Sequence, residues 1–270
     1  MRAEEALKQG DPVTALAELE NAVRSNPADA KLRVFLFQLL AVLGQWDRSL
    51  TQLNLAGELD ATNLAMVNTY REALACEALR AQVFSGNKDP MVFGEPAPWV
   101  ALLLEALRFA SEGRVEQSQG LRSEAFEQAP ATGGTIDGAA FSWISDADQR
   151  LGPLLEAIIN GRYYWVPFQH IRALVVEEPT DLRDLVWAPA HITWANAGET
   201  VALIPSRYPG SESSDDPRIQ MARRTDWVEQ GSGLFVGLGQ RMLATDAGEY
   251  PLLQTRRVEL GLQADATVGA

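Results

Sequence analysis

A frame of small residues that recurs in the first half of this chain is the feature that most constrains its fold. The frame occurs three times, at Gly10, Ala15, Ala22, Pro27, at Gly44, Ser49, Ala56, Ala61, and at Gly113, Ser118, Ala125, Pro130. Glycine at the first position ends a helix and allows a tight turn, and proline at the last position, which the second copy replaces with Ala61, stops the next helix. The small residues between them let two helices cross closely. The frame therefore predicts a series of helical hairpins.

The first two copies are 34 residues apart, a spacing typical of tetratricopeptide-like repeats. We therefore predict a helical-repeat domain over residues 1–133 of the 270-residue chain. The third copy follows after almost two further periods, so we expect one degenerate repeat with a longer helix over 64–93. That helix should cover 61–84, and a loop should follow over 87–98. An ordinary helical bundle with a fortuitous glycine and proline rhythm is the alternative interpretation.

The composition changes at 130–138, where proline, threonine and three glycines fall together, and we place a domain boundary there. Ser145 and Asp148 resemble a capping signal and predict a helix to about residue 160. Beyond it, runs rich in aromatic and β-branched residues predict strands at 163–168, 171–176, 186–194, 201–205, 234–243 and 252–258.

Turn residues separate some of these strands. Asn196-Ala197-Gly198 and Asp246-Ala247-Gly248 predict two hairpins, and the polar tract 208–217 predicts an exposed loop. The predicted fold class is α+β: a tetratricopeptide-like helical-repeat domain over 1–133, a smaller strand-rich α+β domain over 134–260, and a flexible tail over 261–270.

The charge balance narrows the choice of partners. The net charge is −13, and both halves of the chain are acidic. Polyanions would be repelled, so neither nucleic acid nor an anionic membrane is an expected partner. No stretch approaches the roughly 18 apolar residues of a membrane span. The one cysteine, Cys76, cannot form an internal disulfide, which favours a reducing compartment, and we expect a cytoplasmic protein.

The chain offers few groups for catalysis. With only His170, His191 and one cysteine as soft ligands, we expect no metal site, and no cofactor is expected. No lysine-containing phosphate-binding loop occurs, and no set of nucleophile, base and orienting group can be assembled. The chain is therefore predicted not to be an enzyme.

Three aspartates, Asp137, Asp146 and Asp148, could in principle form an acidic pair, although capping and loop solvation explain them more simply. An enzyme with a site at the domain junction, around Asp146, Arg162 and His170, is the alternative to a non-catalytic protein.

Two segments are candidates for binding a protein partner. Stacked hairpins form a concave groove, lined by the first helix of each hairpin, that can hold a peptide or a helix. This face of the second hairpin is predicted to carry Lys31, Val34, Gln38, Ala41 and Val42. The alternative is that the long helix over 61–84, or the C-terminal domain, fills this groove.

The second candidate is an aromatic tract at 163–168. Strand alternation sends Tyr163 and Trp165 to one face, where they could lie exposed at an interface. The alternative is that these aromatic residues form the core of a small sheet.

Long segments of the chain resemble the ImpE/TagJ family, also called SciE-type proteins, of bacterial type VI secretion clusters. The resembling segments are LRVFLFQLLAVLGQWDRSLTQL (32–53), TYREALACEALRAQVFSG (69–86), FSWISDADQRLGPLLEAIINGRYYWVPFQHI (141–171), DLRDLVWAPA (181–190), ALIPSRYPGSE (202–212) and RTDWVEQGSGLFVGLGQRMLATDAGEYPLL (224–253). The segment after Val258 extends beyond the typical core of the family.

The resemblance implies a non-catalytic accessory or adaptor protein of the secretion machine. Its implied partner is the small subunit of the contractile sheath, TssB, bound through that subunit's N-terminal helix. By this route the resemblance also implies a link to sheath assembly, or to sheath disassembly by the ATPase ClpV. A scaffold for another component of the same apparatus is a further alternative. The family supplies no catalytic residues.

Overall fold

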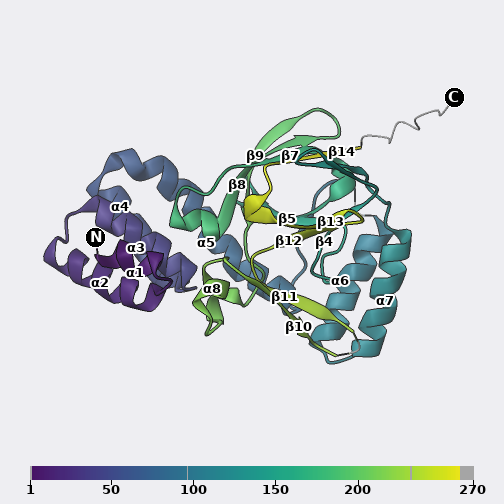
Figure 1. Ribbon diagram of the computed structural model, residues 1–270, viewed down its shortest axis with the longest axis horizontal. Coiled ribbons are helices and arrows are strands. Elements are labelled where there is room, and N and C mark those ends of the chain that lie inside the picture. Colours follow the sequence, from purple (N-terminus) through teal and green to yellow (C-terminus); the bar gives the residue numbers. More distant parts are fainter. Residues whose placement is uncertain (1, 96, 232, 262–270) are drawn as a thin grey trace.

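Helices lie at both ends of the molecule, and strands lie between them (Figure 1). The computed structural model describes residues 2–95, 97–231 and 233–261, so the tail predicted over 261–270 lies outside the described residues except for Gly261. The α-helices are α1 (Arg2–Lys8), α2 (Pro12–Ser25), α3 (Ala30–Val42), α4 (Trp46–Leu59), α5 (Leu64–Phe84), α6 (Pro98–Ser111), α7 (Val115–Gln128) and α8 (Pro217–Gln220). The predicted mixed α+β fold with N-terminal repeat helices is confirmed.

The repeated frame has the predicted physical role in the α1–α2, α3–α4 and α6–α7 hairpins. Gly10, Gly44 and Gly113 end the first helices with positive φ angles of 81°, 67° and 75°, which glycine adopts at little cost. Ser49 and Ser118 are buried, and each hydroxyl donates to a carbonyl of the preceding helix, to Phe37 at 2.8 Å and to Ala106 at 2.7 Å. The same small side chain thus allows close packing and joins the two helices of a hairpin.

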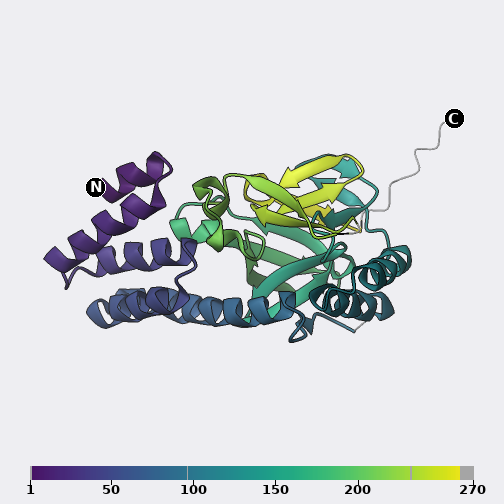
Figure 2. The ribbon, with the colours of Figure 1, turned by 90° about the horizontal axis from the view of Figure 1, so that it is seen from below.

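The helical segments do not form one continuous stack. Figure 2 shows α1 to α4 at one end, the long helix α5 running beneath the sheet, and the α6–α7 hairpin at the other end. The long helix predicted over 61–84 is confirmed as the short 3₁₀ helix η1 (Ala61–Asn63) followed by α5. In the described part of the chain, α5 is followed by strand β1 (Met91–Val92) in place of a second helix that would complete a repeat.

A nine-stranded sheet forms the centre of the molecule, in the order β1-β6-β5-β9-β8-β7-β14-β2-β3. Its strands besides β1 are β2 (Gly134–Ile136), β3 (Ala139–Phe141), β5 (Leu154–Ile159), β6 (Arg162–Pro167), β7 (Ile171–Val176), β8 (Trp187–Trp194), β9 (Glu199–Pro205) and β14 (Arg257–Leu260). Every pairing is antiparallel except that of β1 with β6.

Two smaller sheets lie beside it. One has the order β13 (Gly248–Pro251), β12 (Met242–Thr245), β4 (Ile144–Asp146), and the other pairs β10 (Thr225–Glu229) with β11 (Phe235–Gly239). The short helices η2 (Phe168–His170), η3 (Leu182–Leu185), η4 (Ser211–Ser213) and η5 (Leu252–Gln254) connect the strands. The hairpins predicted at 196–198 and 246–248 are confirmed, since they join β8 to β9 and β12 to β13.

Several boundaries differ from the prediction. The helix predicted over 145–160 is wrong, because this segment forms β4, a turn and β5. All six residues of β5 are buried, and such an apolar run does not distinguish a central strand from a buried helix. The single strand predicted at 234–243 is divided between β11 and β12 at Gly239, whose φ is +89°. The strand predicted over 252–258 begins as η5, and the tract 208–217 is not wholly exposed, because Tyr208 and Ser211 are fully buried.

The two faces of the central sheet belong to two hydrophobic clusters. On β5 and β6, Ile158, Tyr163 and Trp165 pack with the helices, whereas Ala157 and Val166 face the opposite cluster. Side-chain alternation explains this division. Because the helices and one sheet face share a core, we expect the segments on either side of 130–138 to stabilise each other. The domain bounds 1–133 and 134–260 stay a prediction.

Candidate functional site

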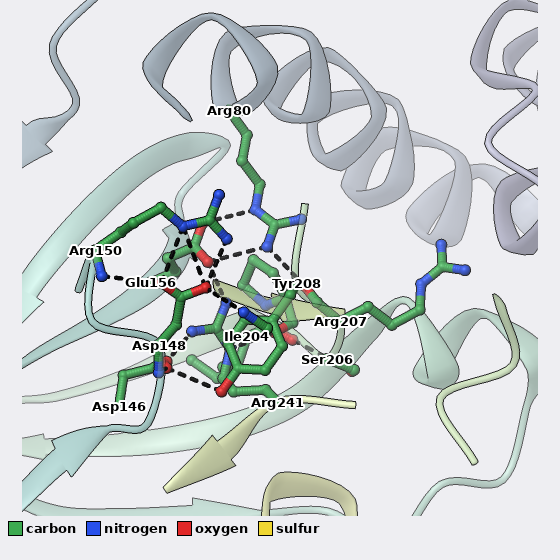
Figure 3. Close-up of polar contacts among 12 residues, drawn as sticks. Arg80, Asp146, Asp148, Arg150, Glu156, Ile204, Ser206, Arg207, Tyr208 and Arg241 are labelled. Atoms are coloured by element: carbon green, nitrogen blue, oxygen red, sulfur yellow. Dashed lines mark hydrogen bonds and ion pairs between the residues drawn. The ribbon is translucent and has the colours of Figure 1, made fainter. Parts of the chain in front are cut away.

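A buried charge network joins the long helix to the central sheet (Figure 3). The alternation of β5 turns Glu156 toward α5, where Arg80 donates to both of its carboxylate oxygens, at 2.6 and 3.0 Å. Arg80 also donates to the Arg207 carbonyl and lies 3.4 Å from Glu77. Glu77 in turn accepts a hydrogen bond from the Trp187 indole at 2.8 Å. The network therefore ties one helix to three strand segments.

Arg241 extends the network toward the small three-stranded sheet. Its guanidinium forms ion pairs with Asp146 at the end of β4 and with Glu156, and it donates to the Pro205 carbonyl at 2.8 Å. The Tyr208 hydroxyl donates to Asp146 at 3.0 Å. Arg241 and Glu156 are fully buried, so these charges depend on one another for compensation.

The two central carboxyls have opposite pKa shifts. Burial disfavours ionisation of Glu156, but the charges of Arg80 and Arg241 outweigh it and lower the pKa to about 2. Burial raises the pKa of Asp146 to about 6, against the opposing charge of Arg241. Burial also raises the pKa of the neighbouring Tyr208 well above its ordinary value.

The arrangement holds charges in place and leaves them almost without solvent contact, although Asp146 also borders a large groove beside the three-stranded sheet. Arg80, Asp146, Glu156 and Arg241 have exposed fractions of 5%, 2%, 0% and 0%. Asp148 completes the cluster as a positioning group, since it accepts hydrogen bonds from the Arg150 side chain and from the Gly237 amide at 2.9 Å. The expectation that loop solvation explains Asp146 and Asp148 is therefore wrong. The expected local capping is present, because Asp146 accepts from the Asp148 amide at 2.8 Å and Asp148 from the Arg150 amide at 2.9 Å.

The residues of the alternative catalytic site are not brought together. Arg162 begins β6 and is exposed, whereas His170 follows the other end of that strand in η2. Within the described ranges, no hydrogen bond or ion pair links Asp146, Arg162 and His170. Asp137 serves a backbone role, accepting from the amides of Arg256 and Arg257, and His191 pairs with exposed Glu177 at 3.1 Å.

The described residues also bear on metal binding and on membrane insertion. Among the described residues, no three or more histidine, cysteine, aspartate or glutamate side chains are grouped to hold a metal ion. Within the same ranges, no helix combines the length and apolar character needed to cross a bilayer.

The predicted groove on α3 is closed by the C-terminal half of the same chain. Gln38 is 5% exposed, and Ala41 and Val42 are fully buried. Arg207 caps the end of α3, donating to the Val42 carbonyl at 2.7 Å and to the Ala41 carbonyl at 3.3 Å, the groups that a helix leaves unpaired at its C-terminus. A partner cannot reach these three residues, which corrects the prediction in favour of its alternative. Of the predicted set, Lys31 is exposed and Val34 is half-buried.

The aromatic tract is also part of the interior. Tyr163 is 1% exposed and Trp165 is fully buried. The Trp165 indole donates to the Tyr163 hydroxyl at 2.8 Å, and its ring lies 5.8 Å from that of Phe84 on α5. These residues join the helix to the sheet and are not available to a partner.

An apolar groove of about 720 Å³ lies where α7, the three-stranded sheet and the β10–β11 hairpin meet. Its floor includes a cross-strand row, because Ala244 pairs with Ser145 on one side and with Glu249 on the other. Its volume is within the range of ligand-binding pockets. A second hollow of the described surface, of about 550 Å³, lies between α4 and α5, but Trp46 is its one aromatic lining residue and the charged Asp47, Arg48 and Arg71 also line it.

Aromatic side chains from separate elements line the groove. Phe126 comes from α7, Trp143 precedes β4, and Trp227 and Phe235 come from the β10–β11 hairpin. They are 38%, 40%, 37% and 42% exposed, and among the described residues they are all of the markedly exposed aromatic side chains. Hairpin register places Trp227, Gly237 and Phe235 on one face, because positions two apart share a face.

Two glycines make this arrangement possible. A Cβ atom on Gly152 would lie 2.3 Å from the Phe126 ring, and a Cβ on Gly237 would lie 2.2 Å from the Tyr208 ring. Neither position has room for a side chain, so the Phe126 ring packs directly on the backbone of Gly152 and the Tyr208 ring on that of Gly237. Sequence reasoning missed these residues because exposed aromatic groups far apart in the chain give no local pattern.

Together, the repeat hairpins, the enclosed charges and the open apolar groove define a class of protein: a tetratricopeptide-type protein with a strand-rich domain and a surface suited to binding another protein. Comparison with known proteins then identifies the family. Residues 6–72 match the tetratricopeptide repeat model, and residues 138–259 match the model of the ImpE protein. The chain belongs to the ImpE/TagJ family.

The membership rests on a long alignment. The chain is 51% identical, over 259 residues, to the type VI secretion system accessory component TagJ of Pseudomonas aeruginosa. The alignment covers 96% of this chain and 91% of that protein. The fold is shared with the crystal structure of protein VPA1032 from Vibrio parahaemolyticus, with a TM-score of 0.87, 24% identity, and coverage of 98% and 99% of the two chains.

Proposed function

We propose that this chain is a non-catalytic accessory protein of a bacterial type VI secretion system. In this role it acts in the cytoplasm and binds the small subunit of the contractile sheath through that subunit's N-terminal helix. Through this contact it is linked to sheath assembly or to disassembly by the ATPase ClpV. The similarity to the accessory component TagJ supports this role.

The observation that carries the proposal is the separation of charge from surface. Arg80, Glu156 and Arg241 are enclosed in a charge network, whereas the large open hollow is lined mainly by aromatic and apolar residues. Asp146 is the network residue that borders this hollow, and it is 2% exposed and paired with Arg241. Catalysis requires reactive groups that a substrate can reach, whereas a binding surface requires accessible apolar area. The structure therefore favours an adaptor over an enzyme.

Calorimetry with purified proteins tests the proposal. The full-length chain is titrated with the sheath small subunit, with the same subunit lacking its N-terminal helix, and with a peptide of that helix. We expect binding to the intact subunit and to the peptide, and loss of binding when the helix is removed. Equal affinity for the truncated subunit would exclude the N-terminal helix as the contact.

A further inference from the structure

The apolar groove has an acidic rim. Glu249 lines it, is exposed, and has no hydrogen bond or ion pair in the described part of the chain. Glu124 and Glu127 are exposed on α7, the helix that carries Phe126, and Glu229 is exposed on β10, where it pairs with Phe235. The basic residue of α7, Arg122, is buried. The groove thus presents apolar walls and uncompensated negative charge to a partner.

The floor favours a helical occupant. Ser145, Ala244 and Glu249 present the face of a sheet to the groove, and the backbone groups between β12 and its neighbours β4 and β13 are used in pairing. An extended peptide lying on this floor would leave its own amides and carbonyls unpaired beside aromatic groups, which is costly. A helix pairs its own backbone groups, and the small Ser145 and Ala244 side chains let it approach closely.

The negative charge at the groove disfavours occupants that are themselves acidic. A second copy of this chain carries a net charge of −13 and would be repelled by the acidic rim. Nucleic acid and an anionic bilayer would be repelled for the same reason. A segment with an apolar face flanked by lysine or arginine satisfies both the aromatic walls and the rim.

We infer that the groove bounded by Phe126, Trp143, Trp227 and Phe235 binds a partner helix with an apolar face and basic flanks. The inference rests on the proposed function, which makes this helix the N-terminal helix of the sheath small subunit. Its apolar side chains lie between the four aromatic rings, and its basic residues lie beside Glu249.

Calorimetry with the full-length chain and the peptide of that helix tests the inference. The groove variants are Trp143→Ala and Glu249→Lys. The matched controls, Val13→Ala and Glu199→Lys, change exposed residues outside the groove. Glu249→Lys keeps the test decisive if Trp143→Ala does not fold, because Glu249 lies at the surface without a partner. Circular dichroism establishes which variants are folded.

We expect Trp143→Ala to weaken binding at least tenfold, about 1.4 kcal/mol, as aromatic anchors do at interfaces. Glu249→Lys should weaken binding several-fold and reduce its dependence on salt. Neither control should change the affinity more than about twofold.

The outcomes separate the inference from the proposed function. If the wild-type chain binds and both folded groove variants bind equally well, the inference is wrong while the proposed function stands. If Trp143→Ala weakens binding but neither salt nor Glu249→Lys has an effect, the basic chemistry assigned to the partner is wrong. If the wild-type chain does not bind the peptide or the sheath subunit, the proposed function fails and the inference fails with it.

Discussion

Replacing Arg80 should reveal how strongly the charge network holds the helices to the sheet. Arg80→Met removes the donor that contacts both oxygens of Glu156, the Arg207 carbonyl and, at 3.4 Å, Glu77. Glu156 then keeps only Arg241 as a cationic partner, and Glu77 keeps the Trp187 indole. Breaking a buried ion pair by removing one partner costs about 3–5 kcal/mol, because a charge is left buried without compensation.

The pKa of Glu156 gives an independent magnitude. It lies at about 2, against an ordinary value of 4.5, and at about 1.4 kcal/mol per pH unit this corresponds to about 3 kcal/mol in favour of the ionised form. Arg80 and Arg241 share that contribution. The two routes agree on a loss of a few kcal/mol in the free energy of unfolding, or roughly 10 °C in Tm for a chain of this size.

Urea unfolding followed by circular dichroism measures the change. Arg71→Met is the matched control, because Arg71 lies on the same helix and is exposed, so it should change stability by no more than about 0.5 kcal/mol. The double variant Arg80→Met with Glu156→Gln should recover part of the loss, since it removes the stranded charge. An Arg80→Met protein within about 1 kcal/mol of the wild type would refute the reasoning that this network stabilises the contact between α5 and the sheet.

Three further predictions follow from the same geometry. Glu156 has a lowered pKa, so its contribution to stability is complete above about pH 4.5 and is lost as the pH falls toward 2. Asp146 has a raised pKa of about 6, so it lowers stability increasingly as the pH rises from 3.8 to 6. In a pH series of urea melts, Glu156→Gln should remove the loss of stability at low pH, and Asp146→Asn should remove the loss between pH 3.8 and 6. Gly237→Ala should lower stability by about 1–3 kcal/mol and weaken peptide binding, because its Cβ meets the Tyr208 ring and displaces Trp227 opposite it; unchanged melting and calorimetry would contradict this. A fragment of residues 1–133 should unfold at lower temperature than the whole chain, since Tyr70 and Arg80 lose partners on the sheet; a fragment that melts like the intact protein would instead establish two independent folding units.

Local patterns in the sequence determined most of the secondary structure. Helical hairpins followed from the spacing of Gly44, Ser49 and their equivalents, because a tight turn and a close crossing each require a small residue at a defined position. The strands at β6, β7, β8 and β9 and the turns at 196–198 and 246–248 followed from side-chain alternation and turn chemistry. These interactions link residues within a few positions of each other, so the sequence displays them directly.

Tertiary structure decided which surfaces remain open. The α3 face and the tract containing Tyr163 and Trp165 looked suitable for a partner, but the chain itself covers both. Whether an apolar face meets solvent or another element depends on contacts such as Arg207 with Val42, whose positions are 165 residues apart. No periodic pattern records such a pairing.

The charge network and the aromatic groove illustrate the same limit. Arg80 and Glu156 are separated by 76 residues, and Arg241 and Asp146 by 95, so their burial became visible only when the sheet brought them together. Phe126, Trp143, Trp227 and Phe235 come from different elements and form a groove through the packing of those elements. Composition and repeats determine what kind of elements a chain forms, and the packing of those elements decides which side chains are left for a partner.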